Sequence, residues 1–149
     1  MAVHKRIAVL AIGGTLFSAS SAIASGQLPP SQIEDRKLES FAACRVALET
    51  IWRKDLAKAD PKPIPAEKGE RQTLIYTKGV VPIDANHAEY AVEEGWQFRT
   101  PLPDVHQIRT SYSYDQRRYA CVGNHLSGTS TQGYAQQGYA PMDGKAPAE

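Results

Sequence analysis

The sequence predicts an α+β fold: one long N-terminal amphipathic helix packed on a small antiparallel β-sheet, stapled by a disulfide and followed by a disordered C-terminal tail. Three observations predict it: a segment without Gly or Pro and with apolar residues at helical spacing, later runs rich in β-branched and aromatic residues, and two cysteines, one in each kind of segment. The 149 residues, 42% hydrophobic and 22% charged, suit one small domain and exclude a fibre, a collagen or a multidomain enzyme.

Residues 1–24 are typical of a signal peptide. His4, Lys5 and Arg6 precede an uncharged run, and the run ends in the small-residue site Ala22-Ile23-Ala24. A membrane-spanning helix needs about 20 apolar residues, more than this run supplies. We expect cleavage after Ala24, export to the periplasm or the medium, and no transmembrane segment after processing. A linker, residues 25–30, follows.

Cleavage changes the charge balance. The whole chain has 17 basic and 16 acidic residues, a formal charge of +1. Loss of Lys5 and Arg6 leaves 15 against 16, a formal charge of −1. A nearly neutral chain offers no general attraction for nucleic acid, so we expect no nucleic-acid partner.

Residues 31–58 are predicted to form the helix. Ser31 and Glu34 have the spacing of a capping box, and Asp60-Pro61 supplies the stop. The apolar residues recur at three- and four-residue intervals and gather on one side: Leu38, Phe41, Cys44, Leu48, Ile51 and Trp52. Such a helix is suited to lie on a flat apolar surface.

The strands are predicted from β-branched and aromatic runs. Residues 61–65 form an extended connector, and residues 72–77 form a strand that Gly79 and Pro82 close. Residues 84–94 are ambiguous, because Asp84 can cap a short helix that ends at Gly95, whereas the apolar residues of 90–98 alternate as in a strand. We favour the helix, followed by a strand over residues 96–100.

Two further strands, residues 107–114 and 117–122, are predicted to form a hairpin with a tight turn near Asp115-Gln116. Beyond Asn124 the sequence is rich in Gly, Ser, Thr, Gln and Ala, and it nearly repeats itself in 132–136 and 137–140. Such a composition buries little apolar surface, so we expect residues 125–149 to be disordered and the ordered domain to span residues 31–124.

Cys44 and Cys121 are expected to form a disulfide. Both survive cleavage of the leader, and an even number of cysteines in an oxidising compartment favours pairing. Cys44 lies on the apolar side of the predicted helix, within reach of a sheet strand that carries Cys121. Closing so long a loop should stabilise the fold by roughly 4 kcal/mol.

Motifs for catalysis and for metal or cofactor binding are missing from the sequence. His87, His106 and His125 lack metal-ligand spacing, and the chain has no nucleophile elbow, dinucleotide fingerprint or phosphate-binding loop. We therefore expect no metal site, no cofactor and no catalytic residue. Glu89, Glu93 and Glu94 lie beside Trp96, and an acidic pair next to an aromatic residue keeps a glycosidase-like alternative open.

The richest local feature is a tyrosine- and arginine-bearing stretch. Both residue types favour binding interfaces, because each offers a large contact area and a polar end. We take as a candidate binding surface Arg109, Tyr112, Tyr114, Arg117 and Tyr119. Alternation places Arg109 opposite Tyr112 and Tyr114, and a half-buried core strand explains the same pattern.

These observations favour an exported, non-catalytic domain that binds a protein or a cell-envelope component through its sheet. A small hydrolase-like enzyme, with a histidine and a glutamate brought together by the fold, is the first alternative. A carrier of small apolar ligands, with a cavity between helix and sheet, is the second.

Overall fold

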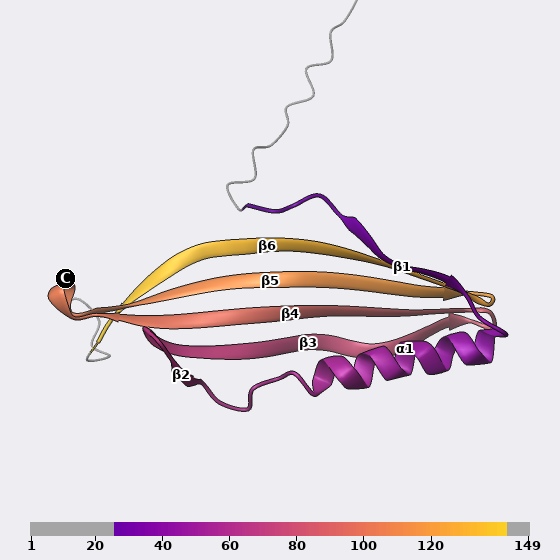
Figure 1. Cartoon of the computed structure of the whole chain (residues 1–149), viewed down its shortest axis with the longest axis horizontal. Coiled ribbons are helices and arrows are strands. Elements are labelled where there is room, and N and C mark those ends of the chain that lie inside the picture. Colours follow the sequence, from indigo (N-terminus) through magenta and orange to yellow (C-terminus); the bar gives the residue numbers. More distant parts are fainter. Residues whose placement is uncertain (1–25, 143–149) are drawn as a thin grey trace, which may run out of the picture.

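The computed structural model describes residues 26–142, which form one six-stranded antiparallel sheet and one α-helix (Figure 1). The elements are β1 (Ser31–Lys37), α1 (Phe41–Leu56), β2 (Ile64–Ala66), β3 (Gly69–Asp84), β4 (His87–Leu102), a 3₁₀ turn (Pro103–Val105), β5 (Gln107–Val122) and β6 (His125–Pro141). The strand order is β1-β6-β5-β4-β3-β2, so β3 to β6 form a meander with a short strand at each edge.

The mixed class and the antiparallel sheet are confirmed, but the expected proportions are wrong. Strands β3, β4 and β5 have 16 residues each and β6 has 17, which corresponds to a sheet about 53 Å long. Helix α1 has 16 residues and a length of about 24 Å, so it covers less than half of the sheet's length (Figure 1). The sheet, not the helix, dominates the fold.

The helix begins ten residues later than predicted. Ser40 is its N-cap, and the Ser40 side chain accepts the N–H of Ala43 at 3.1 Å. The expected cap, Ser31, begins strand β1 and pairs with Ser130 of β6. A capping box satisfies two backbone groups locally, whereas pairing with β6 satisfies backbone groups along the whole of β1.

Residues 84–94 do not form the favoured helix. The Asp84 carboxylate accepts the N–H of Asn86 at 2.7 Å, so it stabilises the turn between β3 and β4 instead of capping a helix. In β4 the buried residues Ala88, Tyr90 and Val92 alternate with exposed ones. The strand alternative is therefore the correct one, because a period of two matches the face that the sheet buries.

The predicted hairpin turn at Asp115-Gln116 is also wrong. Strand β5 runs unbroken through it, and Asp115 pairs with Glu94 on one side and Gln132 on the other. Tertiary contacts offset the poor strand propensity of aspartate, because Ser130 donates to the Asp115 carboxylate and Arg117 Nε lies 3.3 Å from it. In β3, Gly79 and Pro82 mark register irregularities rather than the strand's end.

The polar segment after Asn124 is not disordered as expected. Residues 125–141 form β6, an inner strand that pairs with β5 and, over residues 125–130, with β1. Its glycines help to explain this, because rings of neighbouring tyrosines lie against them: Tyr119 over Gly128 and Tyr114 over Gly133. Neither the predicted leader, residues 1–24, nor residues 143–149 belong to the described part.

The core lies between α1 and one half of the sheet. It consists of Cys44, Leu48, Ala88, Tyr90, Val92, Tyr119, Cys121 and Leu126. The expected disulfide is confirmed: Cys44 of α1 is bonded to Cys121 of β5, with their Cα atoms 5.9 Å apart. It crosses the layer between helix and sheet and is compatible with the expected export.

Within residues 26–142, no helix is long and apolar enough to cross a membrane.

Candidate functional site

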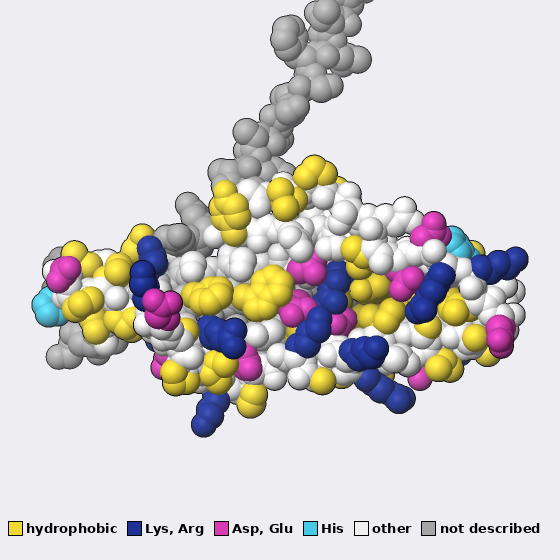
Figure 2. All heavy atoms as spheres, viewed as in Figure 1, with side chains coloured by type: hydrophobic (Ala, Val, Ile, Leu, Met, Phe, Trp, Pro, Cys, Tyr) yellow, Lys and Arg dark blue, Asp and Glu magenta, His cyan; other side chains and the backbone are white. Residues whose placement is uncertain are grey.

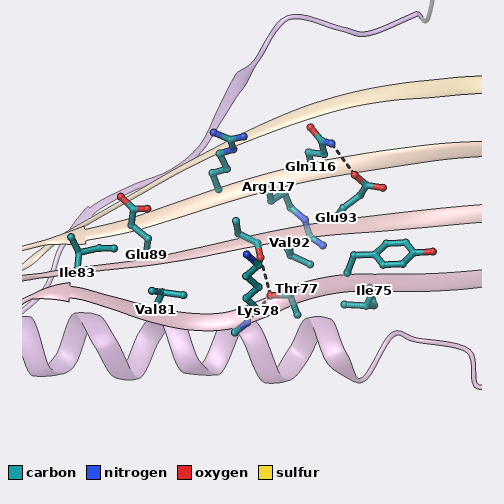
Figure 3. A pocket seen from close by; sticks show the side chains of 14 residues that line it. Ile75, Thr77, Lys78, Val81, Ile83, Glu89, Val92, Glu93, Gln116 and Arg117 are labelled. Carbon is teal, nitrogen blue, oxygen red and sulfur yellow. Dashed lines mark hydrogen bonds between the residues drawn. The ribbon is translucent and has the colours of Figure 1, made fainter.

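Within residues 26–142, one face of the sheet carries no helix. Tyr119 and Cys121 of β5 point into the core beneath α1, so side chains that alternate with them lie on the opposite face, here called the open face. A groove of about 880 Å³ crosses β3, β4 and β5 on the open face (Figure 3). Its volume is in the range of small-molecule sites. Its lining includes Tyr76, Lys78, Val81, Ile83, Glu89, Ala91, Glu93, Gln116 and Arg118.

Apolar side chains border the groove along β3. Tyr76 is 54% exposed, Val81 41% and Ile83 53%, although all three belong to strand β3. On β4 the lining includes Ala91, whose small methyl group leaves space above the strand. Exposed apolar side chains on a sheet face make this border a candidate for contact with another molecule.

The two acidic side chains of the groove already have partners. Glu93 accepts hydrogen bonds from Tyr112 Oη at 2.7 Å and from Gln116 Nε2 at 2.8 Å. Burial and the Glu93 carboxylate both raise the pKa of Tyr112, so its hydroxyl stays a donor. Glu89 lies 3.1 Å from His87 Nε2. The acidic groups are thus held by neighbours on the sheet.

Two of the three basic residues in the groove lining, Lys78 and Arg118, lack such partners, whereas Arg117 is ion-paired. Within the described part of the chain, neither Lys78 nor Arg118 forms an ion pair or a side-chain hydrogen bond with an acidic residue. Both are exposed. The groove therefore carries two basic side chains without an ion-pair contact and two carboxylates, Glu89 and Glu93, so its lining is of mixed charge.

The candidate surface from the sequence is divided between the two faces. Tyr112 and Tyr114 lie on the open face, with ring centroids 6.3 Å apart, and Tyr112 packs over Gly95 beside the groove. Arg109, Arg117 and Tyr119 belong to the opposite face by alternation. The five residues share one strand but do not form one surface.

Arg117 instead centres a buried ionic cluster at the end of α1. Its Nη1 lies 3.0 Å from Asp55 and its Nη2 lies 2.6 Å from Glu94. Lys58 contacts the same two carboxylates, at 3.1 and 2.7 Å, and Tyr90 donates to Asp55 at 3.1 Å. Figure 2 shows acidic and basic side chains gathered near the middle of the molecule.

The ionic cluster joins the end of α1 to strands β4 and β5. Burial lowers the pKa of Lys58, but its hydrogen bonds to Glu94 and Asp55 outweigh that effect and the net shift is upward. Burial likewise opposes ionisation of Arg117, yet the charge of Asp55 and the other acidic groups raises its pKa overall. Because both cations stay charged, the two carboxylates are held as acceptors at the point where α1 ends.

The structure does not bring a histidine to the acidic pair. His87 lies near Glu89, and His125 Nε2 lies 2.6 Å from Asp35, whose pKa it lowers by hydrogen bonding. His106 occupies the turn before β5 with a φ of 51°. Among residues 26–142, no hydrogen bond or ion pair joins a histidine to Glu93 or Glu94, and no group of three metal-ligating side chains is found.

Most of the groove lies where the sequence predicts no strand. Lys78, Val81 and Ile83 lie beyond the end of the strand predicted over residues 72–77, and the groove residues of β4 lie in the predicted short helix. The alternation of apolar residues after His87 is the signal that recovers β4. The bulge that keeps β3 continuous through Gly79 has no comparable signal.

Comparisons with protein-family models, curated proteins and solved structures found no match. The fold and the groove alone therefore define the class of protein: an antiparallel α+β domain in which one helix covers part of one sheet face and the other face carries a groove.

Proposed function

We propose that this protein is a non-catalytic binding protein that holds a protein or cell-envelope component on the open face of its sheet. The observation that carries the proposal is the groove across β3, β4 and β5, bordered by exposed Tyr76, Val81 and Ile83. An antiparallel sheet that faces water normally carries polar residues on that side. Burial of large apolar side chains is favourable, and on the open face it happens only when another molecule covers them.

The rigidity of the groove's floor supports binding without chemistry. Strands β4 and β5 pair without interruption, and the disulfide and the ionic cluster fix α1 behind them. A preformed surface loses little conformational entropy on binding. Glu93 in the groove accepts hydrogen bonds from both Tyr112 and Gln116, an arrangement that orders the wall of a site.

Site-specific photo-crosslinking tests the proposal. A photoreactive amino acid replaces Val81 in the groove or, as a control, Val46 on the outer side of α1, which is 63% exposed. In cells that produce the protein, we expect one discrete adduct from position 81 and none from position 46. The adduct should disappear when excess wild-type protein competes, and persist when the competitor is Ala91→Trp, whose indole fills the groove.

Three results would contradict the proposal. Equal labelling from positions 81 and 46 would show that contact is unspecific. The absence of any adduct from position 81 would show that the groove takes no partner. Competition by Ala91→Trp as strong as that by the wild type would place the partner elsewhere. Circular dichroism and the unfolding midpoint of Ala91→Trp verify that this competitor is folded.

A further inference from the structure

One half of the sheet has no core. The half away from α1, here called the bare half, consists of residues 69–73 of β3, 96–102 of β4, 107–113 of β5 and 134–141 of β6. Every buried hydrophobic residue of the described chain lies in α1 or in the other half of the sheet, and none of the described side chains of the bare half is buried. A sheet is stabilised when it buries a face against a second layer. Within residues 26–142 the bare half has no such layer (Figure 1).

Aromatic side chains gather on the face of the bare half that continues the core. Trp96 and Phe98 follow Glu94 in β4 with the same alternation, so they lie on the side that α1 covers in the other half. Tyr134 and Tyr139 of β6 lie on that side too, because each is opposite a β5 residue that pairs with the same face of β4. Phe98 is 40% exposed and each tyrosine 59%. Figure 2 shows hydrophobic side chains there, next to the charged ones.

Helix α1 gives this face the shape of a step that fits a second copy of the chain. A helix with its side chains is about 10 Å thick, which is also the spacing between two packed sheets. A copy turned by a two-fold axis across the strands therefore lays its bare half on this one, and each α1 then lies at the end of the partner's sheet. Such a contact uses the same surface on both copies and closes as a dimer.

The area of the bare half is sufficient for a weak dimer. Residues 96–102 of β4 extend about 24 Å, and four strands are about 19 Å wide. Two such faces enclose about 900 Å² even as flat planes, more than the roughly 800 Å² below which most incidental contacts fall. The relief of the side chains adds to this area, so the contact reaches the about 1,000 Å² of a specific but weak interface.

The charges of this face are complementary under the same two-fold axis. Its only charged residues in the bare half are Arg71, which lies near Asp60, and Arg109. Arg109 forms no ion pair within the described residues, and its buried Nε has no hydrogen-bond partner there. At the α1 end, the ionic cluster has three carboxylates against two cations: Asp55, Glu94 and Asp115 against Lys58 and Arg117. The axis brings Arg109 of each copy toward this acidic excess of the other.

We propose that the protein forms a two-fold symmetric dimer in which the bare halves of two copies pack face to face. Phe98, Tyr134 and Tyr139 of each copy are buried between the sheets, whose strands cross at about 30°. The contact lies on the face opposite the groove, so both grooves stay open in the dimer. The inference is therefore independent of the proposed function.

Sedimentation velocity of the oxidised protein over a range of concentrations tests the dimer. We expect reversible association with a dissociation constant on the order of 10–100 μM, as for interfaces at the small end of the range. Phe98→Glu and Tyr139→Glu should each weaken association by about tenfold or more, because each buries a carboxylate in the contact. The matched control is Val122→Glu on the open face, a position that is 59% exposed, and it should associate like the wild type.

A photoreactive amino acid at position 98 identifies the neighbour directly. In the purified protein we expect an adduct of twice the chain's mass, linked to the bare half of the second copy. A monomer at every concentration, with no such adduct, would overturn the inference. Association unaffected by both Phe98→Glu and Tyr139→Glu, or weakened equally by Val122→Glu, would place the contact elsewhere. An adduct that forms only in cells and contains another protein would show that the bare half takes a different partner. Circular dichroism verifies that each variant is folded.

Discussion

Removal of Arg117 is the sharpest test of how the helix is anchored. In the variant Arg117→Leu, Asp55 and Glu94 lose contacts at 3.0 and 2.6 Å, although their side chains are only 2% and 11% exposed. Removing one partner of a buried ion pair typically costs about 3–5 kcal/mol, because the other charge stays buried without compensation. Lys58 still contacts both carboxylates and its side chain is 42% exposed, so we take the lower end, about 3 kcal/mol.

Urea unfolding of the oxidised protein measures this cost, with tryptophan fluorescence as the signal. The control is Arg53→Leu, which breaks an exposed pair with Glu49 at 3.7 Å and should cost no more than about 0.5 kcal/mol. A third variant adds Asp55→Asn and Glu94→Gln to Arg117→Leu. It should recover part of the lost stability, since neutral side chains need no buried cation.

Two results would refute this reasoning. A loss of less than about 1 kcal/mol in Arg117→Leu would show that the ionic cluster behaves like a surface pair. A triple variant less stable than Arg117→Leu alone would show that the carboxylates stabilise the fold by contacts other than the one to Arg117.

Three further predictions concern the disulfide, the last strand and the connector after α1. Replacing both Cys44 and Cys121 by alanine should lower the free energy of unfolding by about 4.5 kcal/mol, because the bridge closes a loop over a separation of 77 residues. Chemical denaturation measures this loss, and an unchanged unfolding midpoint would contradict the prediction. Truncation after Asn124 removes β6, with the buried Leu126 and Ser130, so thermal melting should lose its cooperative transition; a melt like that of the full chain would contradict this. The Thr73 N–H donates to Asp60 at 2.7 Å and lowers the Asp60 pKa, so its stabilisation is present above pH 3.8 and is lost as pH falls below that value. Asp60→Asn should therefore show a smaller drop in unfolding midpoint between pH 6 and pH 3, and an identical drop would refute the assignment.

Local patterns in the sequence determined the features that depend on near neighbours. Apolar spacing around Cys44, Leu48 and Trp52 predicted a helix with its buried side correctly placed, and the even cysteine count predicted the Cys44–Cys121 bridge. Alternation in β5 correctly separated Arg109 from Tyr112 and Tyr114. Each of these results follows from the fixed periods of a helix and a strand, which the chain carries within a few residues.

Only the tertiary structure decided where the strands run and which face carries a groove. Ser31, Asp84 and Asp115 each have a local capping or turn preference, and each is overridden or redirected by pairing with a strand distant in sequence. The polar segment after Asn124 becomes an inner strand because β1 and β5 supply hydrogen-bond partners on both sides, which composition cannot reveal. The groove likewise exists only through register: Lys78, Ala91 and Arg118, spread over 41 positions of the chain, become neighbours across three strands when β3, β4 and β5 pair.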